Sequence, residues 1–143
     1  MDHMTAPSNA AAIKSFVTET LGCRCPDDVF EQIDDHGRAM IPGLAVPFRR
    51  LLIGRRLLIY IVECDEPAAL WAALPVLVEE GKAERDDHGY NRLRVVVVTE
   101  QPVSIEHQAE AIFSSLGNVD KNVHLHVLAR CLIPDCVGAP ARV

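Results

Sequence analysis

Runs of consecutive apolar residues predict strands between residues 56 and 130. The runs LLIYIV and VVVV lie within segments 56–63 and 92–99, and the segment 122–130 is a third candidate. Strands covered on both faces are typically apolar without alternation, so we expect the first two of these strands inside a sheet. Segment 48–53 precedes the first run, and Gly54 between them favours a hairpin closed by a type II′ turn.

Helical spacing of apolar residues predicts four helices. The first covers Asn9–Leu21, and a short one runs from about Pro26 to Ile33, since proline suits a first helical position. A third helix begins at Pro67, with Asp65 or Glu66 as its cap. We expect Pro75 to kink or split this helix and Gly81 to end it. The fourth covers Ile105–Leu116, capped by Ser104. Segment 34–47 contains two glycines and two prolines and predicts a loop.

The resulting element order is α-α-β-β-α-β-α-β. Helices join the last three strands, which predicts that these strands are parallel, with the first strand antiparallel to them. We therefore expect a single three-layer α/β domain around a mixed sheet of about four strands, in an undetermined order. Residues 1–8 are expected to be a flexible N-terminus, residues 9–130 the domain, and residues 131–143 an irregular tail.

Composition narrows the function classes. The 143 residues are 49% hydrophobic and carry a net charge of −6, which argues against general nucleic-acid binding because that depends on Lys and Arg meeting phosphates. The sequence has no secretory signal pattern and no apolar run long enough for a membrane span, so we expect a cytoplasmic protein without membrane contact. It also lacks dinucleotide-binding, P-loop, nucleophile-elbow and zincin motifs.

The topology predicts where a site would lie. In open α/β sheets, ligands bind beyond the carboxyl ends of the parallel strands. Cys64 and Asp65 follow the second predicted strand, and Thr99 and Glu100 end the third. These four residues are candidate site-edge residues, and Glu63 and Glu66 add further carboxylates there.

The five cysteines permit three interpretations. They can be packed apolar side chains, since free cysteine is often buried. Alternatively, Cys23, Cys25, Cys131 and Cys136 form a zinc or iron–sulfur site from two segments. The third interpretation is redox chemistry at Cys25, where a helix start and Arg24 lower a thiol pKa.

His124 and His126 lie two apart on the last predicted strand, so they share a face, as metal-binding pairs or ordinary polar residues do. Two function hypotheses follow. The first is a non-catalytic binding module for another protein or a second copy of itself. The second is a thiol-dependent metal, iron–sulfur or redox protein that uses Cys23, Cys25, Cys131 and Cys136.

Overall fold

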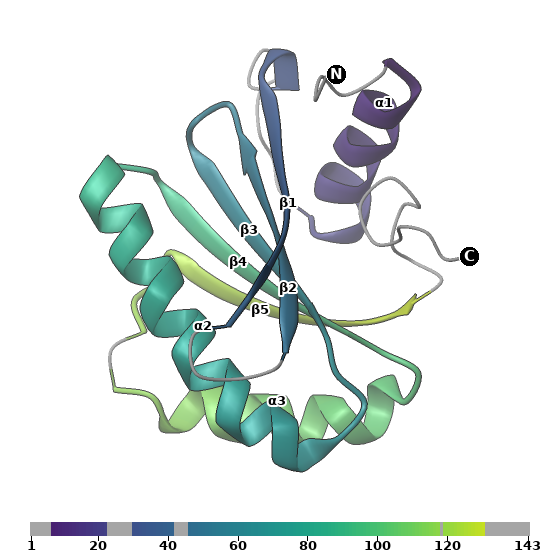
Figure 1. Cartoon of the computed structure of the whole chain (residues 1–143), viewed down its shortest axis with the longest axis vertical. Coiled ribbons are helices and arrows are strands. Elements are labelled where there is room, and N and C mark those ends of the chain that lie inside the picture. Colours follow the sequence, from purple (N-terminus) through teal and green to yellow (C-terminus); the bar gives the residue numbers. More distant parts are fainter. Residues whose placement is uncertain (1–6, 23–29, 42–45, 118, 131–143) are drawn as a thin grey trace.

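The computed structural model describes residues 7–22, 30–41, 46–117 and 119–130, which form an α/β fold with a mixed sheet (Figure 1). The described strands lie in the order β1-β2-β3-β4-β5. β2 is antiparallel to both neighbours, whereas β3, β4 and β5 are parallel, as the sequence predicts. In chain order the elements are α1 (Pro7–Ser15), the π-helix η1 (Phe16–Thr20), β1 (Ile33–Met40), β2 (Pro47–Ile53), β3 (Leu57–Glu63), α2 (Pro67–His88), β4 (Arg92–Thr99), α3 (Pro102–Ser115) and β5 (Val123–Ala129).

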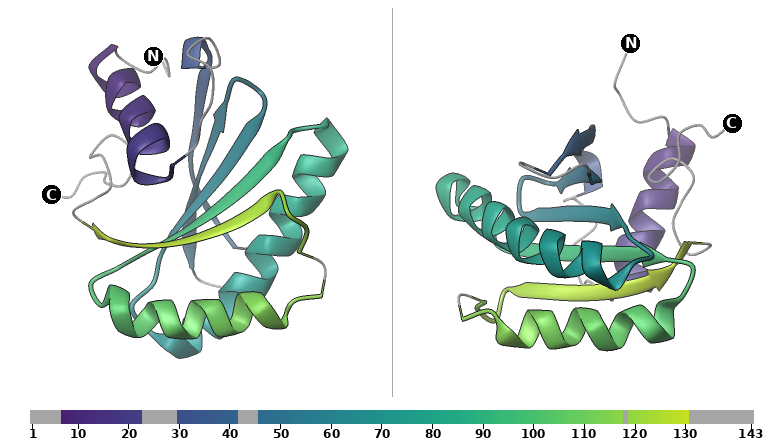
Figure 2. Two further views of the ribbon diagram at one scale, coloured as in Figure 1. Left: turned by 180° about the vertical axis from the view of Figure 1, so that it is seen from behind. Right: turned by 60° about the horizontal axis from the view of Figure 1, so that its bottom comes forward.

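Helices cover both faces of the sheet, in the three layers that the sequence predicts (Figure 2). On one face, α2 and α3 pack on a core that includes Leu58, Tyr60, Val95 and Val97. On the other face, α1 and η1 bury Ile13, Phe16 and Val17 against a second set of strand residues: Ile59, Ile61, Val96 and Val98. Because successive strand residues point to opposite faces, this two-sided cover requires the continuous apolar runs of β3 and β4.

The predicted hairpin is present, but its turn is of another type. β2 pairs with β3 from Phe48 opposite Val62 to Ile53 opposite Leu57. Gly54 and Arg55 both have positive φ, at 59° and 57°. A type II′ turn places only its first central residue at positive φ, so the predicted turn type is wrong.

β1 is a strand that the sequence pattern missed, so the prediction of about four strands is wrong. Its residues were assigned to the loop 34–47 and to the end of the helix Pro26–Ile33, whose residues 26–29 lie outside the described ranges. β1 is a polar strand at the edge of the described sheet, and its register shifts between Asp35 and Arg38, around Gly37 at φ 74°. An edge strand has little apolar periodicity, and its bulge glycine resembles a turn signal.

α2 is longer than predicted. It continues through Pro75 and Gly81 to His88, and ends at Gly89, which has φ 74°. Gly81 is therefore a packing residue rather than a helix end. α3 begins at Pro102, with Gln101 rather than Ser104 at the N-cap position.

α1 begins at Pro7, and η1 continues it to Thr20, close to the predicted helix Asn9–Leu21. Residues 1–6 and the predicted tail 131–143 lie outside the described residues. Within the described part of the chain, no helix combines the length and the apolarity that a membrane span requires.

Candidate functional site

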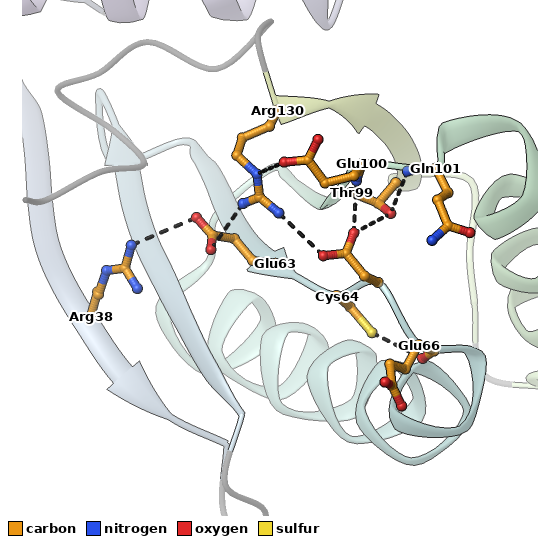
Figure 3. A network of polar contacts seen from close by, with 9 residues as sticks. Arg38, Glu63, Cys64, Glu66, Thr99, Glu100, Gln101 and Arg130 are labelled. Carbon is orange, nitrogen blue, oxygen red and sulfur yellow. Dashed lines mark hydrogen bonds and ion pairs between the residues drawn. The ribbon is translucent and has the colours of Figure 1, made fainter. Parts of the chain in front are cut away.

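The carboxyl ends of β3, β4 and β5 meet at one edge of the sheet, where the sequence predicts a site. Figure 3 shows the polar side chains that gather there, among them Glu63 at the end of β3, Thr99 at the end of β4, Glu100 directly after it, and Arg130 after β5. The pairing of β3 with β4 and of β4 with β5 explains this convergence, because parallel neighbours end at the same edge.

Asp65 connects the loop after β3 to the loop after β4. Its Oδ1 accepts hydrogen bonds from the Thr99 hydroxyl at 2.8 Å and from the Glu100 backbone N–H at 2.7 Å. These two donors, the backbone N–H first, hold the pKa of Asp65 below its ordinary value. The Thr99 hydroxyl also accepts from the Gln101 backbone N–H at 3.1 Å. Of the two predicted caps, Glu66 occupies the N-cap position of α2 but makes no side-chain cap bond, and Asp65 is not the cap.

Arg130 is the central cation of this edge. Its Nε donates to Glu100 Oε2 at 2.8 Å, its Nη1 lies 3.2 Å from Glu63 Oε1, and its Nη2 lies 3.4 Å from Asp65 Oδ2. The hydrogen bond to Glu100, followed by the attraction of the other carboxylates, raises the pKa of Arg130. Arg38 of β1 adds a second cation, 3.7 Å from Glu63.

The chemical consequence is an edge on which three carboxylates share two cations. Each of the three carboxylates that meet Arg130 is an ion-pair partner, and the lowered pKa of Asp65 makes its carboxylate a weak base. Sequence reasoning selected Asp65, Thr99 and Glu100 as site-edge residues, and it placed Arg130 at the end of the last strand without giving it a role, whereas Arg38 was not considered. The position of Arg130 directly after the last strand was the available signal, whereas Arg38 belongs to the unpredicted β1.

Cys64 lies at the same edge but faces the core. Its side chain is buried, and its Sγ donates to the Glu66 backbone carbonyl at 3.3 Å. Burial raises the pKa of the Cys64 thiol, so it is protonated near neutral pH. Cys64 therefore acts as a small packing residue.

The other cysteines fall on residues that the structure does not describe. Cys23, Cys25, Cys131 and Cys136 all lie outside the described ranges, so the zinc, iron–sulfur and redox interpretations stay predictions. Among the described residues, no group of three or more His, Cys, Asp or Glu side chains is arranged to hold a metal ion.

The two histidines of β5 share a face, as expected, and meet an arginine. Arg94 and His124 are register partners on β4 and β5, and Arg94 Nη1 lies 2.8 Å from His126 Nε2.

Comparison of the chain with protein-family models, curated proteins and solved structures finds no match.

Proposed function

We propose that this protein is a non-catalytic binding module whose α2 and α3 helices dock a basic, amphipathic segment of another protein. The observation that carries the proposal is the exposure of Trp71, the single tryptophan of the chain, on the outer surface of α2, where 49% of it is accessible. Large aromatic side chains left in contact with water on a helix face are typical of interaction surfaces.

Trp71 belongs to an apolar stripe. Ala68 and Ala72 are also exposed and Pro75 is half-buried, so residues i, i+3, i+4 and i+7 of α2 present apolar side chains on one side. We call Ala68, Trp71, Ala72 and Pro75 the Trp71 face. The indole N–H of Trp71 donates to Gln108 Oε1 of α3 at 3.0 Å, which limits the freedom of the ring. A ring held in this way loses little conformational entropy on binding.

The charge of the two helices favours a basic partner. Six acidic side chains on them are exposed, whereas Lys82 and Arg85, their only Lys and Arg residues, are half-buried and buried. α2 has five acidic residues and two basic ones, and α3 has two acidic residues and no Lys or Arg. The two helices together therefore carry a charge of −5, whereas the net charge of the whole chain is −6. The exposed acids are Glu79, Glu80, Asp86, Asp87, Glu106 and Glu110.

The negative charge of α2 and α3 also distinguishes between two candidate partners for the Trp71 face. A second copy docking through the same face would bring acidic helices together, which like-charge repulsion opposes. A basic segment gains attraction from the same residues and faster association. The ion pairs around Arg130 support a non-catalytic role, since Glu63, Asp65 and Glu100 are all paired with this arginine.

The test uses a defined probe, a fluorescein-labelled helical peptide built only from Leu and Lys. We expect saturable binding in fluorescence anisotropy, weaker as NaCl rises from about 50 mM to about 500 mM because salt screens the acidic residues. Trp71→Ala should weaken it by about tenfold or more. Met40→Ala is the matched control, since Met40 is 55% exposed but lies on β1.

Three results would count against the proposal. Equal affinity for a Leu and Glu peptide would show that charge does not select the partner. Equal affinity of wild type and Trp71→Ala for the basic peptide would place the contact elsewhere. Concentration-dependent dimerisation that Trp71→Ala abolishes would identify a second copy as the occupant instead.

A further inference from the structure

β5 lacks the features that protect an edge strand from pairing. The strand order places β1 and β5 at the two edges of the described sheet. β1 carries two acids and an arginine and has a register shift around Gly37, and both features discourage an added strand. β5 has the sequence VHLHVLA, without proline, lysine, arginine or an acid, and it keeps one continuous register with β4. Of the two edges, β5 is therefore the one suited to pairing.

The backbone polar groups of β5 point alternately toward β4 and toward the outer side of the sheet. The Leu93 N–H of β4 donates to the Asn122 carbonyl at 3.0 Å. In a parallel pair, this bond directs the N–H and C=O groups of the even-numbered residues of β5 toward β4. The groups of Leu125 and Val127 therefore point to the outer side, where no described strand pairs with them. They are the donors and acceptors that an added strand would use.

A groove lies between β5 and α3, which run beside each other (Figure 2). It has a volume of about 300 Å³ and is lined by residues 123–126 of β5 and by Glu110, Phe113 and Ser114 of α3. Consecutive strand residues point their side chains to opposite faces of the sheet. Because four consecutive residues line the groove, the backbone of β5 forms part of its wall. An extended segment beside β5 would lie along this groove.

The lining of the groove selects the side chains of such a segment. Leu125 and Phe113 are half-buried and offer apolar contacts. Glu110 is exposed and is the single acid of a lining that contains no Lys or Arg. A segment with apolar and basic side chains on the face toward α3 complements these residues. A second copy pairing through its own β5 would bring the two α3 helices and their Glu110 carboxylates together, which like-charge repulsion opposes.

We propose that β5 and α3 bind an extended segment of another protein by strand addition. The segment pairs with the outer edge of β5 through backbone hydrogen bonds, and it places apolar and basic side chains toward α3. This site does not include the Trp71 face, and the proposal is independent of the docking proposal above.

The probe is the fluorescein-labelled peptide Lys-Thr-Val-Thr-Val-Thr-Lys, which has the length of β5. Its Lys and Val side chains share one face when it is extended, and its symmetric sequence places a lysine toward Glu110 in either strand direction. We expect saturable binding in fluorescence anisotropy, with a dissociation constant on the order of 100 μM. The same peptide with Glu in place of Lys should bind about fivefold or more weakly. Trp71→Ala should bind the probe as wild type does, which separates this site from the Trp71 face.

Two N-methylated peptides test whether backbone hydrogen bonds hold the probe. Methylation of both valines removes donors from one edge of the extended peptide, and methylation of two threonines removes donors from the other edge. Only one edge can face β5. One of the two modified peptides should therefore bind about tenfold or more weakly than the other.

Hydrogen exchange locates the pairing on β5. In the free protein, the amides of Leu125 and Val127 should exchange faster than the amide of His126, which points to β4. At a probe concentration about ten times the dissociation constant, exchange at Leu125 and Val127 should slow by about fivefold or more, because the bound fraction is protected.

Variants of the strand and the helix provide matched comparisons. Leu125→Pro removes an outward N–H at a position where an edge strand tolerates proline, and should weaken binding by about tenfold or more. Leu125→Ala loses the same side chain but keeps the donor, and should weaken binding by only about threefold. Glu110→Gln should weaken it by about threefold, whereas Glu79→Gln, at an exposed acid of α2, should leave it unchanged. If Leu125→Pro does not fold, the N-methylated peptides make the same test on wild-type protein.

The proposal is overturned if the probe shows no saturable binding or if the two N-methylated peptides bind equally. Slow exchange of the Leu125 amide in the free protein would also overturn it, because the edge would then already be paired. A concentration-dependent dimer that Leu125→Pro dissociates would identify a second copy as the occupant instead.

Discussion

A Cβ atom added at Gly81 of α2 would lie 2.8 Å from both δ-carbons of Leu93 on β4. Gly81 and Leu93 are both buried, so the helix and the strand approach each other here without room for another carbon. This contact explains why a glycine occurs within α2, where it would otherwise weaken the helix.

We expect Gly81→Ala to destabilise the protein by about 1–2 kcal/mol, since overpacking exceeds the gain in helix propensity. Urea unfolding monitored by circular dichroism measures this. Gly117→Ala is the matched control, because a Cβ there meets nothing within 4 Å, and it should be close to neutral. Gly81→Ala combined with Leu93→Val should recover part of the loss. A Gly81→Ala variant as stable as wild type would contradict the close-packing account.

The Arg85–Asp120 pair joins α2 to the loop before β5. Arg85 donates from Nη1 to Oδ1 at 2.9 Å and from Nη2 to Oδ2 at 2.6 Å, and its side chain is only 9% exposed. Asp120→Asn should cost about 1–3 kcal/mol in urea unfolding, because the buried guanidinium loses its charged acceptor. Asp86→Asn, which changes a more exposed partner of the same arginine, should cost clearly less.

The same pair predicts acid sensitivity. The hydrogen bonds from Arg85 hold the pKa of Asp120 well below its ordinary value. A carboxyl whose pKa is lower in the folded state stabilises the fold above its unfolded pKa of about 3.9, and this contribution is lost as the pH falls below that value. Asp120→Asn should therefore lose less stability than wild type between pH 5 and pH 3. An identical loss in both proteins would contradict this linkage.

His126 predicts a second loss of stability on acidification, at a higher pH than the loss that Asp120 predicts. Burial first, and then the charge of Arg94, lower its pKa to about 4. A histidine whose pKa is lower in the folded state stabilises the fold fully above about pH 6.5, and loses this contribution as the pH falls toward 4. We expect roughly 1–2 kcal/mol of this loss, allowing for partial exposure.

The measurement is urea unfolding at pH 7 and pH 4.5. His126→Gln should show a smaller decrease between these pH values than wild type does. His107→Gln, on the exposed surface of α3, should behave as wild type. The Arg94–His126 contact would be the wrong explanation if His107→Gln reduced the pH dependence as much as His126→Gln.

Cys64 should be the slowest of the five thiols. Its side chain is 6% exposed, and its raised pKa leaves little thiolate at pH 7. With a disulfide reagent, we expect its reaction to be about tenfold or more slower in native protein than in urea, since it requires local opening. Cys64→Ala should remove this slow phase. If the slow phase persists in that variant, another cysteine is the protected one.

The sequence predicted the interior strands and the site edge because local pattern determines both. The apolar runs of β3 and β4 are explained by burial on both faces, and the convergence of Asp65, Thr99 and Glu100 follows from parallel pairing. β1 was missed because an edge strand with a glycine bulge has no apolar period.

The missed contacts depend on distance in space rather than on local pattern. Gly81 looked like a helix end because the sequence does not show that Leu93 lies above it. Arg130 reaches Glu63 only because β5 ends beside β4, and a linear pattern does not specify strand order. The burial of Arg94 likewise depends on the packing of η1 over the sheet.

The emission of Trp71 tests the central claim most directly, because the chain contains no other tryptophan. Its exposed ring should emit at long wavelength in the free protein. Titration with an unlabelled Leu and Lys peptide should shift this emission saturably to shorter wavelength, as the ring leaves water, whereas a Leu and Glu peptide should not. An emission maximum that the basic peptide leaves unchanged while binding occurs would contradict docking on the Trp71 face.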